Sequence, residues 1–391
     1  MRTAPGPPLQ ARVLGGGPTG ALAALALAHA GWRVELCDPQ SAETLQARRR
    51  AYALTHSSRR LLERLDLWQA LEPGLEPFDQ LRLLDAALGR WVRFQATDLP
   101  MRWRGRGHPV GWIGRHTTLM ALLLARLTAH PAVCLRLGEP SFPDPAEAAD
   151  GMALVVAADG PASPTRAALG IGCWGWTYGQ SCLTAELDLQ GAAPGTAWEL
   201  LRPEGPSALL PLGHGRFQLV WSAPTPRHRR REQLDPAAFL DQLAPLLPQG
   251  IEPGTLHDPA RVFPVALSLA HRLSSGRTLL VGESGHRCHP VGGQGLNLCW
   301  RDVAVLHRLA QRAAAGRLAP SRLGSAYGRR RWADLLLILL STDLLVRLFS
   351  SRQHLSLLLR RPLIALLSRA AASRRLTLSL MTAGLPDLRR A

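Results

Sequence analysis

Apolar and polar positions along the chain first define a strand, a helix and a second strand. Residues 12–14 form a short strand-like run, residues 21–30 consist almost entirely of alanine and leucine, and residues 32–37 alternate apolar and polar side chains. A run of alanine and leucine favours a helix, and alternation favours a strand. This order predicts a βαβ unit with two parallel strands.

A second strand-and-helix pattern lies between residues 277 and 302. Residues 278–281 are mainly apolar, and residues 296–309 carry apolar side chains at helical spacing. The loop between them contains Pro290 and glycines at 282, 285, 292, 293 and 295. Closely spaced glycines let backbone approach a ligand, and a helix that begins there presents free N–H groups and the positive end of its dipole. The pattern predicts a site for an anionic or planar, electron-rich ligand.

The central part of the chain predicts a different kind of sheet. Between residues 176 and 223, alternating segments such as TAWELLR and FQLVWSA are separated by the turn sequences PEGP and GHGR. This spacing is typical of antiparallel strands, and residues 72–109 also predict strands outside the βαβ unit. From residue 327 onward, leucines recur at helical spacing among arginines, without about 18 uncharged apolar residues in a row, so no membrane-spanning helix is expected.

Together these patterns predict an α/β fold, α+β overall, with a Rossmann-like domain, an inserted, mostly antiparallel β-sheet domain and a helical C-terminal region. The first domain comprises residues 1–71, 110–175 and 262–326, the second residues 72–109 and 176–261, and the helical region residues 327–391.

The net charge and the cysteines bear on partners and location. The chain has 391 residues and a formal net charge of +17, and arginine supplies all of the basic residues. The arginines are spread along the chain without a nucleic-acid-binding module, so no nucleic-acid partner is expected; a membrane surface or mere codon usage explains the charge. The six cysteines lack disulfide-like spacing and no signal segment is recognisable, which predicts a cytoplasmic location. The basic charge allows, in addition, a peripheral position at the inner face of the membrane.

The sequence GGGPTG at residues 15–20 gives the βαβ unit its chemistry, because it matches the pattern G-x-G-x-x-G. Gly15 permits the tight turn, Gly17 admits a pyrophosphate, and Gly20 lets the helix pack on the strand. Asp38 ends the second strand, where a carboxylate can accept a hydrogen bond from a ribose hydroxyl. The combination predicts a dinucleotide site.

Three separated signatures now agree. GGGPTG with Asp38, the sequence ADG at residues 158–160 and VGESGHRCHPVGGQGLNL at residues 281–298 together resemble the FAD-dependent monooxygenases of the para-hydroxybenzoate hydroxylase type. Within that superfamily, nearly the whole chain is similar to the ring hydroxylases of ubiquinone biosynthesis. The resemblance assigns to FAD the residues Gly15, Gly17, Pro18, Gly20, Asp38, Arg50, Arg115, Asp159, Gly160, Gly282, Glu283, Pro290, Gly293, Gln294, Gly295, Leu296 and Asn297.

The resemblance also implies roles. The glycines at 15–20 would hold the FAD pyrophosphate and Asp38 the adenosine ribose, while Arg50 and Arg115 would lie near the flavin and its phosphates. Asp159 with Gly160 would serve both FAD and a passing nicotinamide.

The late glycine loop has further implied roles. Glu283 matches an aspartate that meets the ribityl chain, although it is one methylene longer. The segment from Pro290 to Asn297 would line the isoalloxazine ring. No second dinucleotide fingerprint follows Asp38, so NAD(P)H is expected to dock transiently near Asp159.

The resemblance implies an enzyme that uses NAD(P)H and O2 to hydroxylate a prenylated aromatic through a flavin C4a-hydroperoxide. Alternatives are a hydroxylase of a soluble aromatic or polyketide, a flavin reductase, and a non-catalytic FAD-bound subunit of a quinone-biosynthesis complex. No catalytic acid or base is evident from the sequence. His286, Cys288 and His289 are close enough to suggest a metal, but adjacent loop residues rarely converge on one ion, so no metal is expected.

The C-terminal helices are expected to pack partly on the FAD domain and partly on lipid, over residues 332–381. Arginine stems can lie along apolar surface while their guanidinium groups reach phosphate headgroups. A plain helical cap on the core is the alternative. The basic residues concerned are Arg347, Arg352, Arg360, Arg361, Arg369, Arg374 and Arg375.

Overall fold

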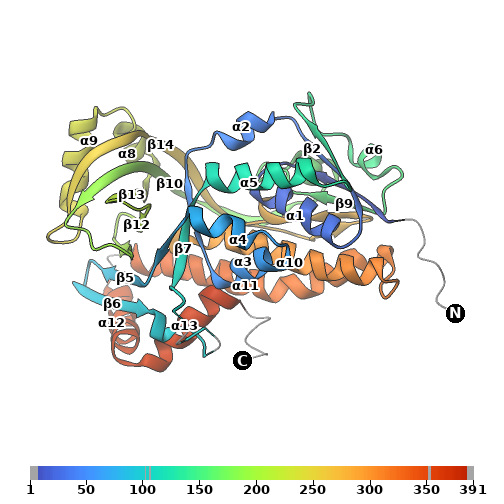
Figure 1. Cartoon of the computed structure of the whole chain (residues 1–391). Coiled ribbons are helices and arrows are strands. Elements are labelled where there is room, and N and C mark those ends of the chain that lie inside the picture. The colour runs from blue at the N-terminus through green and yellow to red at the C-terminus, as the bar shows by residue number, and fades with distance from the viewer. Residues whose placement is uncertain (1–7, 102, 105–106, 351–353, 385–391) are drawn as a thin grey trace.

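The computed structural model describes residues 8–101, 103–104, 107–350 and 354–384. A mainly parallel sheet lies beside a larger, mainly antiparallel sheet, and the long helices α10 (Gln294–Ala314) and α11 (Leu323–Phe349) run along the lower side of the molecule as drawn in Figure 1. The α/β fold class predicted from the sequence is confirmed.

The mainly parallel sheet has six strands in the order β15-β16-β9-β1-β2-β8. Only the short β15 pairs antiparallel, with β16. Every residue of β9 and β16 is buried, as expected for strands covered on both faces. The strands are β1 Gln10–Leu14, β2 Arg33–Asp38, β8 Val133–Leu137, β9 Leu154–Ala157, β15 Ser274–Ser275 and β16 Thr278–Leu280.

Three helices pack together beside this sheet. The predicted Ala/Leu helix is α1 (Pro18–His29), which connects β1 to β2 and contacts both α5 (His116–Ala129) and α10. Residues 20–28 of α1 are all buried, because alanine lets neighbouring elements approach on every side.

The larger sheet has eight strands in the order β17-β14-β10-β13-β12-β11-β5-β6, and among these neighbours only β11 and β5 pair parallel. One face packs with α9 (Pro236–Leu243) in an apolar cluster that contains Leu183 and Leu200. The opposite face contributes Ala197 and Leu201 to a second cluster, with Val291. The strands are β5 Gln80–Asp85, β6 Arg90–Gln95, β10 Cys173–Gln190, β11 Thr196–Leu201, β12 Ser207–Pro211, β13 Arg216–Pro224, β14 Glu252–Ala270 and β17 His286–Arg287.

A small antiparallel sheet, in the order β3-β7-β4, completes the set of strands. Its strands are β3 Ala51–Leu54, β4 Leu75–Phe78 and β7 Gly111–Arg115. The remaining α-helices outside the C-terminal region are α2 Ala42–Gln46, α3 His56–Arg64, α4 Trp68–Leu71, α6 Pro145–Ala149, α7 Pro164–Ala168 and α8 Thr225–Arg231. Short 3₁₀ turns are η1 Glu72–Gly74, η2 Ala96–Asp98, η3 Ala244–Leu246, η4 Gly282–Ser284, η5 Val291–Gly293 and η6 Pro320–Arg322.

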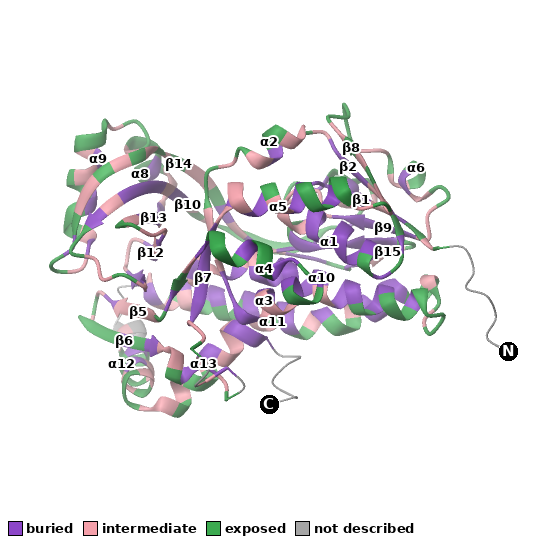
Figure 2. Cartoon of the chain, viewed as in Figure 1, coloured by how far each residue is buried: buried purple, intermediate pink, exposed green. Residues whose placement is uncertain are grey.

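The C-terminal region is helical, as predicted, and continues from α11 into α12 (His354–Arg369) and α13 (Ala371–Ala383). Buried and exposed residues alternate along α11, so one side packs on the protein and the other faces solvent (Figure 2). None of the described helices combines the length and the apolar composition that crossing a bilayer requires.

Two strands run across the domain boundaries that the sequence predicts. β14 continues through residue 262, and β10 begins at Cys173, before residue 176. Because each strand is continuous, the chain offers no linker at these points. The division into domains stays a prediction.

Candidate functional site

The first glycine loop lies between β1 and α1. Gly15 has φ +109°, and a Cβ there would lie 2.3 Å from the Ala158 carbonyl oxygen. A Cβ at Gly20 would lie 1.7 Å from the Gly15 carbonyl oxygen, so both positions require glycine. At Gly17, by contrast, a Cβ meets nothing within 4 Å, and this residue caps α1 without a side-chain hydrogen bond. The N-terminus of α1 therefore offers backbone donors to an anion.

Asp38 ends β2 beside this loop and is largely buried. Its Oδ2 accepts a hydrogen bond from the Gly16 N–H at 2.6 Å, and its Oδ1 accepts one from the Gln40 N–H at 2.7 Å. The carboxylate thus fixes the conformation of the glycine loop. Each of its oxygens has a further lone pair with which to accept from a ligand hydroxyl.

Asp159 and Gly160 follow β9, at the same edge of the parallel sheet. Asp159 Oδ2 accepts from the Thr165 N–H at 3.0 Å, while Oδ1 is buried and has no hydrogen-bond partner within the described residues. Gly160 has φ +88°, and a Cβ there would meet nothing within 4 Å. A buried acceptor beside open space fits a ligand that donates hydrogen bonds.

The second glycine loop, called here the 290–295 loop, leads into α10. Gly292 and Gly293 have φ +70° and +62°, a conformation that side chains rarely adopt. Gly293 caps α10 without a side-chain hydrogen bond, and a Cβ at Gly295 would meet nothing within 4 Å. Gln294 Oε1 is buried without a partner in the described part of the chain. The loop therefore combines an uncapped helix N-terminus with a free amide oxygen, while Gln294 Nε2 donates to the Gly292 carbonyl at 3.0 Å.

Asn297 holds the 290–295 loop against β3 and α3. Its Oδ1 accepts from the Thr55 N–H at 3.0 Å and the Ser58 hydroxyl at 2.7 Å. Its Nδ2 donates to the carbonyl oxygens of Ala53, at 2.7 Å, and Gly293, at 2.8 Å. Since both amide hydrogens are used within the protein, Asn297 positions the loop, and its side-chain donors are not free for a ligand.

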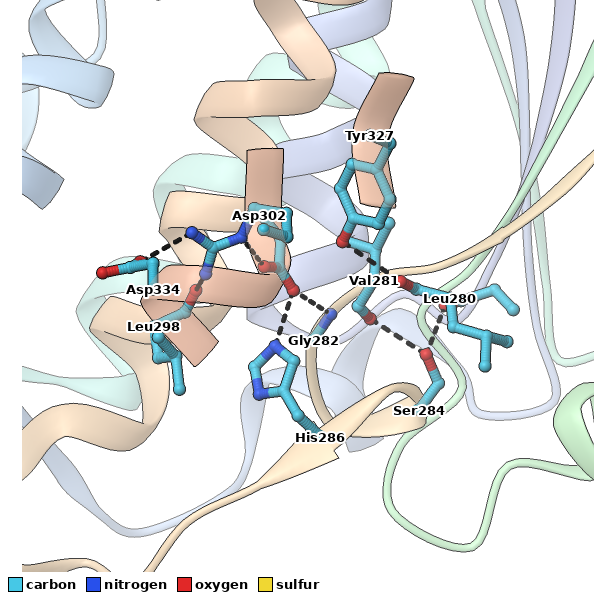
Figure 3. A network of polar contacts seen from close by, with 11 residues as sticks. Leu280, Val281, Gly282, Ser284, His286, Leu298, Asp302, Tyr327 and Asp334 are labelled. Atoms are coloured by element: carbon cyan, nitrogen blue, oxygen red, sulfur yellow. Dashed lines mark hydrogen bonds and ion pairs between the residues drawn. The ribbon is translucent and has the colours of Figure 1, made fainter. Parts of the chain in front are cut away.

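A buried polar network joins the strand before this loop to two helices (Figure 3). Asp302 Oδ2 accepts from the Gly282 N–H at 2.8 Å and lies 2.7 Å from His286 Nε2. Arg331 on α11 donates to Asp302 Oδ1 at 2.5 Å and to Asp334 Oδ2 at 2.6 Å. Burial alone would raise the pKa of Asp302, but His286 and Arg331 outweigh it and hold that pKa below its usual value. The network fixes the turn at Gly282.

The two histidines of this segment, His286 and His289, have different surroundings. His286 faces Asp302, whereas the ring of His289 lies edge-on to Tyr178, with centroids 5.3 Å apart. Burial lowers the pKa of His289 to about 4, so the imidazole is neutral at ordinary pH. Among the residues that the structure describes, no three His, Cys, Asp or Glu side chains are grouped as metal ligands would be.

Gly282 and Glu283 form the turn η4 next to the start of α1. Gly282 has φ +73°, and a Cβ there would lie 2.8 Å from Thr19 Cγ2. Pro18 accepts a hydrogen bond from Trp300 Nε1 at 3.3 Å, which ties the beginning of α1 to α10. The Glu283 side chain is exposed. Packing thus brings the two glycine loops together, although more than 260 positions separate them in the chain.

A basic cavity of about 390 Å³ adjoins β3 and α5 on one side and the larger sheet on the other. Arg115 donates to Glu186 Oε2 at 2.5 Å, and Arg216 lies 3.4 Å from Glu186 Oε1. Arg50 lies near the Tyr52 ring, with its guanidinium carbon 5.8 Å from the ring centroid. The lining residues are Arg48, Arg49, Arg50, Ala51, Arg115, Thr117, Glu186, Arg216, Gln218, His257 and Asp258. An excess of arginine makes the cavity suited to phosphate groups.

Taken together, these residues fit FAD. Two buried oxygens, Asp159 Oδ1 and Gln294 Oε1, are free to accept hydrogen bonds from a ligand. Space for the ligand lies beside the glycines at 17, 160 and 295. The three open glycines lie at the uncapped N-terminus of α1, after β9, and at the uncapped N-terminus of α10. A pyrophosphate suits the first helix terminus, and the negative charge of a reduced flavin suits the second.

One functional candidate was not predicted from the sequence. Glu199 lies on β11, where all six residues are buried, and its Oε2 accepts from the Gly292 N–H at 3.4 Å. Burial raises the pKa of Glu199 to about 8. The sequence contains one sign of this residue, a lone carboxylate in the otherwise apolar segment AWELL. Similarity to a known family did not identify it.

The fold and the paired glycine loops define an FAD-binding protein, and comparison with known proteins specifies the class. Residues 152–333 match the family model described as "FAD binding domain". The structure of HpxO from Klebsiella pneumoniae, solved with FAD and uric acid, superposes with a TM-score of 0.73 at 18% identity, covering 96% of this chain and 97% of that one. The fold and the site therefore define a protein that binds FAD.

Within this class the chain belongs to the family of ubiquinone-biosynthesis hydroxylases. It is 32% identical to ubiquinone hydroxylase UbiL of Rhodospirillum rubrum, over 87% of this chain and 81% of the relative. It is 29% identical to 3-demethoxyubiquinol 3-hydroxylase of Escherichia coli, over 88% of this chain and 90% of that relative. The resemblance inferred from the sequence is confirmed, and the protein is an FAD-dependent monooxygenase whose substrates are a small aromatic molecule and O2.

Proposed function

We propose that this monooxygenase uses NAD(P)H and O2 to hydroxylate the aromatic ring of a prenylated quinone precursor. The observation that carries the proposal is the similarity, over most of both chains, to two enzymes named as hydroxylases of ubiquinone compounds. A bound FAD would supply the redox chemistry, namely hydride uptake from the nicotinamide and transfer of one oxygen atom of O2 to the ring.

Each part of the site has a proposed task. The glycines at 15–20 bind the pyrophosphate, Asp38 the adenosine ribose, and Asp159 with Gly160 a neighbouring part of FAD. The N-terminus of α10 stabilises negative charge on the reduced flavin. Glu283, exposed on η4, would hold the ribityl chain.

The remaining residues line the flavin ring or receive the nicotinamide. Pro290, Gly293, Gln294, Gly295 and Leu296 place backbone along the ring, and Asn297 holds that backbone in position. The arginines of the basic cavity, Arg50 and Arg115 among them, receive the phosphates of FAD or of a transiently bound NAD(P)H.

We also propose that the C-terminal helices contact a membrane surface where the prenyl tail remains. Apolar side chains are exposed on α11, at Leu336, Leu340 and Leu344, and on α12, at Leu358 and Leu366. Not every predicted arginine is available: Arg360 is buried and donates to the Leu348 carbonyl, Arg347 pairs with Asp343, and Arg374 pairs with Asp98. Arg361, Arg369 and Arg375 are exposed, and Arg352 lies outside the described residues.

The enzymatic proposal is tested with purified, FAD-loaded protein. Phenols that carry a short isoprenoid chain should accelerate NAD(P)H oxidation and yield a product heavier by one oxygen atom, whereas phenols without the chain should be poorer substrates. Lipid mass spectrometry of a deletion strain should then show a quinone precursor that lacks one ring hydroxyl. The proposal fails if no prenylated phenol is hydroxylated while a soluble aromatic is turned over efficiently.

A further inference from the structure

Glu199 lies on the face of the larger sheet that meets the 290–295 loop. Along β11, Trp198 and Leu200 belong to the apolar cluster on the α9 side of the sheet. Ala197 and Leu201 belong to the cluster that contains Val291 of the loop. Because side chains alternate along a strand, Glu199 projects to the same side as Ala197 and Leu201. A carboxyl group is thus placed among apolar side chains, facing the loop assigned to the flavin ring.

The surroundings of Glu199 offset little of the free-energy cost of burying its carboxyl group. It is 7% exposed, and among the described residues its hydrogen-bond partner is the Gly292 N–H, at 3.4 Å. Its neighbours in register on β12 and β5 are Ala208 and Leu83. Within the described residues it forms no ion pair. A buried carboxyl without a cation costs folding free energy, so a structural role alone does not explain it.

The titratable group that is coupled electrostatically to Glu199 is the Cys182 thiol of β10, and the strands β13 and β12 lie between β10 and β11. Burial raises the pKa of Cys182 to about 12, so this thiol stays neutral where Glu199 titrates. The loop, β12 and β5 present Gly292, Ala208 and Leu83, which do not titrate. A change in product formation near pH 8 is therefore assigned to the ionisation of Glu199 and not to Cys182.

We propose that Glu199 is a catalytic residue that accepts the proton of the substrate's phenolic hydroxyl during ring hydroxylation. The inference rests on the proposed function only in requiring a substrate with such a hydroxyl. A phenolate donates more electron density to its ring than a phenol, and the ring carbon that receives oxygen must be electron-rich. A general base is most effective when its affinity for the proton approaches that of the group it deprotonates.

The proton transfer balances without a further reactant. The phenolic O–H bond breaks, the proton passes to the Glu199 carboxylate, and the electron pair stays on the substrate oxygen. That pair supplies the ring carbon as it bonds to one oxygen atom of O2, and the O–O bond breaks in the same step. The second oxygen atom keeps the electron pair of that bond and is released as water, with the proton that the ring carbon loses and the hydrogen taken from NAD(P)H. The ring then loses the proton from that carbon to water, and Glu199 returns its proton to the original oxygen, so that both the carboxylate and the aromatic ring are restored.

The test uses FAD-loaded Glu199→Gln, which keeps the shape and the Gly292 contact but cannot take a proton. Product formation should fall by about 100-fold or more, the range typical of a lost general base. Flavin reduction by NAD(P)H should be unchanged. In the wild type, product formation should rise with pH around 8 as the carboxylate forms, and in the variant this rise should disappear. Glu204→Gln is the matched control, because Glu204 lies in the turn between β11 and β12 and pairs with Arg231 of α8.

A second series separates proton transfer from a structural effect. Ring-fluorinated phenols ionise at lower pH, so the defect of Glu199→Gln should shrink as the phenol becomes more acidic. If Glu199→Gln does not fold, Glu199→Asp should fold and retain the pH-dependent rise with a lower rate. Equal rates in the wild type and in Glu199→Gln, or a defect that is the same for every phenol, would overturn the inference. Neither of these results would contradict the proposed function. If the wild type does not hydroxylate prenylated phenols, the proposed function is wrong, and the role of Glu199 can still be tested with any phenol that the enzyme accepts.

Discussion

At the scale of single residues, two buried carboxyl groups show how surroundings set charge. Asp302 is completely buried, but His286 and Arg331 outweigh the cost of burial and hold its pKa low. Glu199 has a single backbone donor, and burial raises its pKa to about 8. The same functional group therefore serves as a permanent anion in one place and as a proton acceptor in the other.

Asp302→Asn is expected to destabilise the protein. Arg331 would remain buried with one of its two carboxylate partners removed, which costs about 3 kcal/mol. Since the folded-state pKa of Asp302 is lowered, its stabilising effect is present above its ordinary pKa of 3.8 and is lost as the pH falls through the folded value. Urea unfolding at pH 7 and in acid should show a difference between wild type and variant that shrinks below about pH 4.

The matched control for this prediction is Glu63→Gln, which breaks the more exposed pair with Arg59 on α3. That change should cost less than about 1 kcal/mol. Asp302→Asn with an equally small effect would contradict the assignment of Asp302 as the centre of the network.

At the scale of elements, sequence periodicity located both glycine loops but not the partners that fix them. The predicted strand, helix and strand are β1, α1 and β2, and the predicted helix at 296–309 begins two residues earlier, at Gln294. His286, Asp302 and Arg331 form one network only because α10 packs on α11, which no local pattern reports. Glu199 was missed because β11 is buried on both faces, so alternation gives no signal there.

Gly17→Val tests the turn between β1 and α1. A Cβ at this position meets no protein atom within 4 Å, and the φ of −64° suits a side chain, so the fold should tolerate valine. The isopropyl group should instead occupy the space of the pyrophosphate and abolish FAD binding. The variant should purify colourless, with a melting temperature near that of wild-type apoprotein. A yellow variant with stoichiometric FAD would show that the pyrophosphate lies elsewhere.

At the scale of the whole molecule, the position of the basic residues matters more for membrane attachment than the size of the net charge. The net charge is +17, but several arginines of the C-terminal helices are used within the protein, and the exposed ones on α12 and α13 lie among exposed leucines. A reversible attachment to a membrane requires salt-sensitive electrostatic attraction together with apolar contact.

Liposome flotation tests this arrangement. The full-length protein should float with anionic vesicles at low salt and be released at high salt, because each exposed arginine near the surface contributes about 1 kcal/mol. Arg361→Glu combined with Arg369→Glu should weaken flotation. Arg229→Glu with Arg230→Glu, on the distant helix α8, changes the charge equally and should not (Figure 1). Equal loss in both double variants would indicate attraction by net charge rather than by the C-terminal helices.

The link between Asp302 and Arg331 also has a consequence for the order in which the protein matures. A ribosome releases the strands of the larger sheet, up to residue 287, before Asp302, and it releases Arg331 later still. Until α11 emerges, the Asp302 carboxylate lacks its arginine and the turn at Gly282 lacks its firm support. The nucleotide pocket, although its first glycines precede the larger sheet in the chain, therefore lacks part of its support until α11 has been made, and stable cofactor loading follows the synthesis of α11.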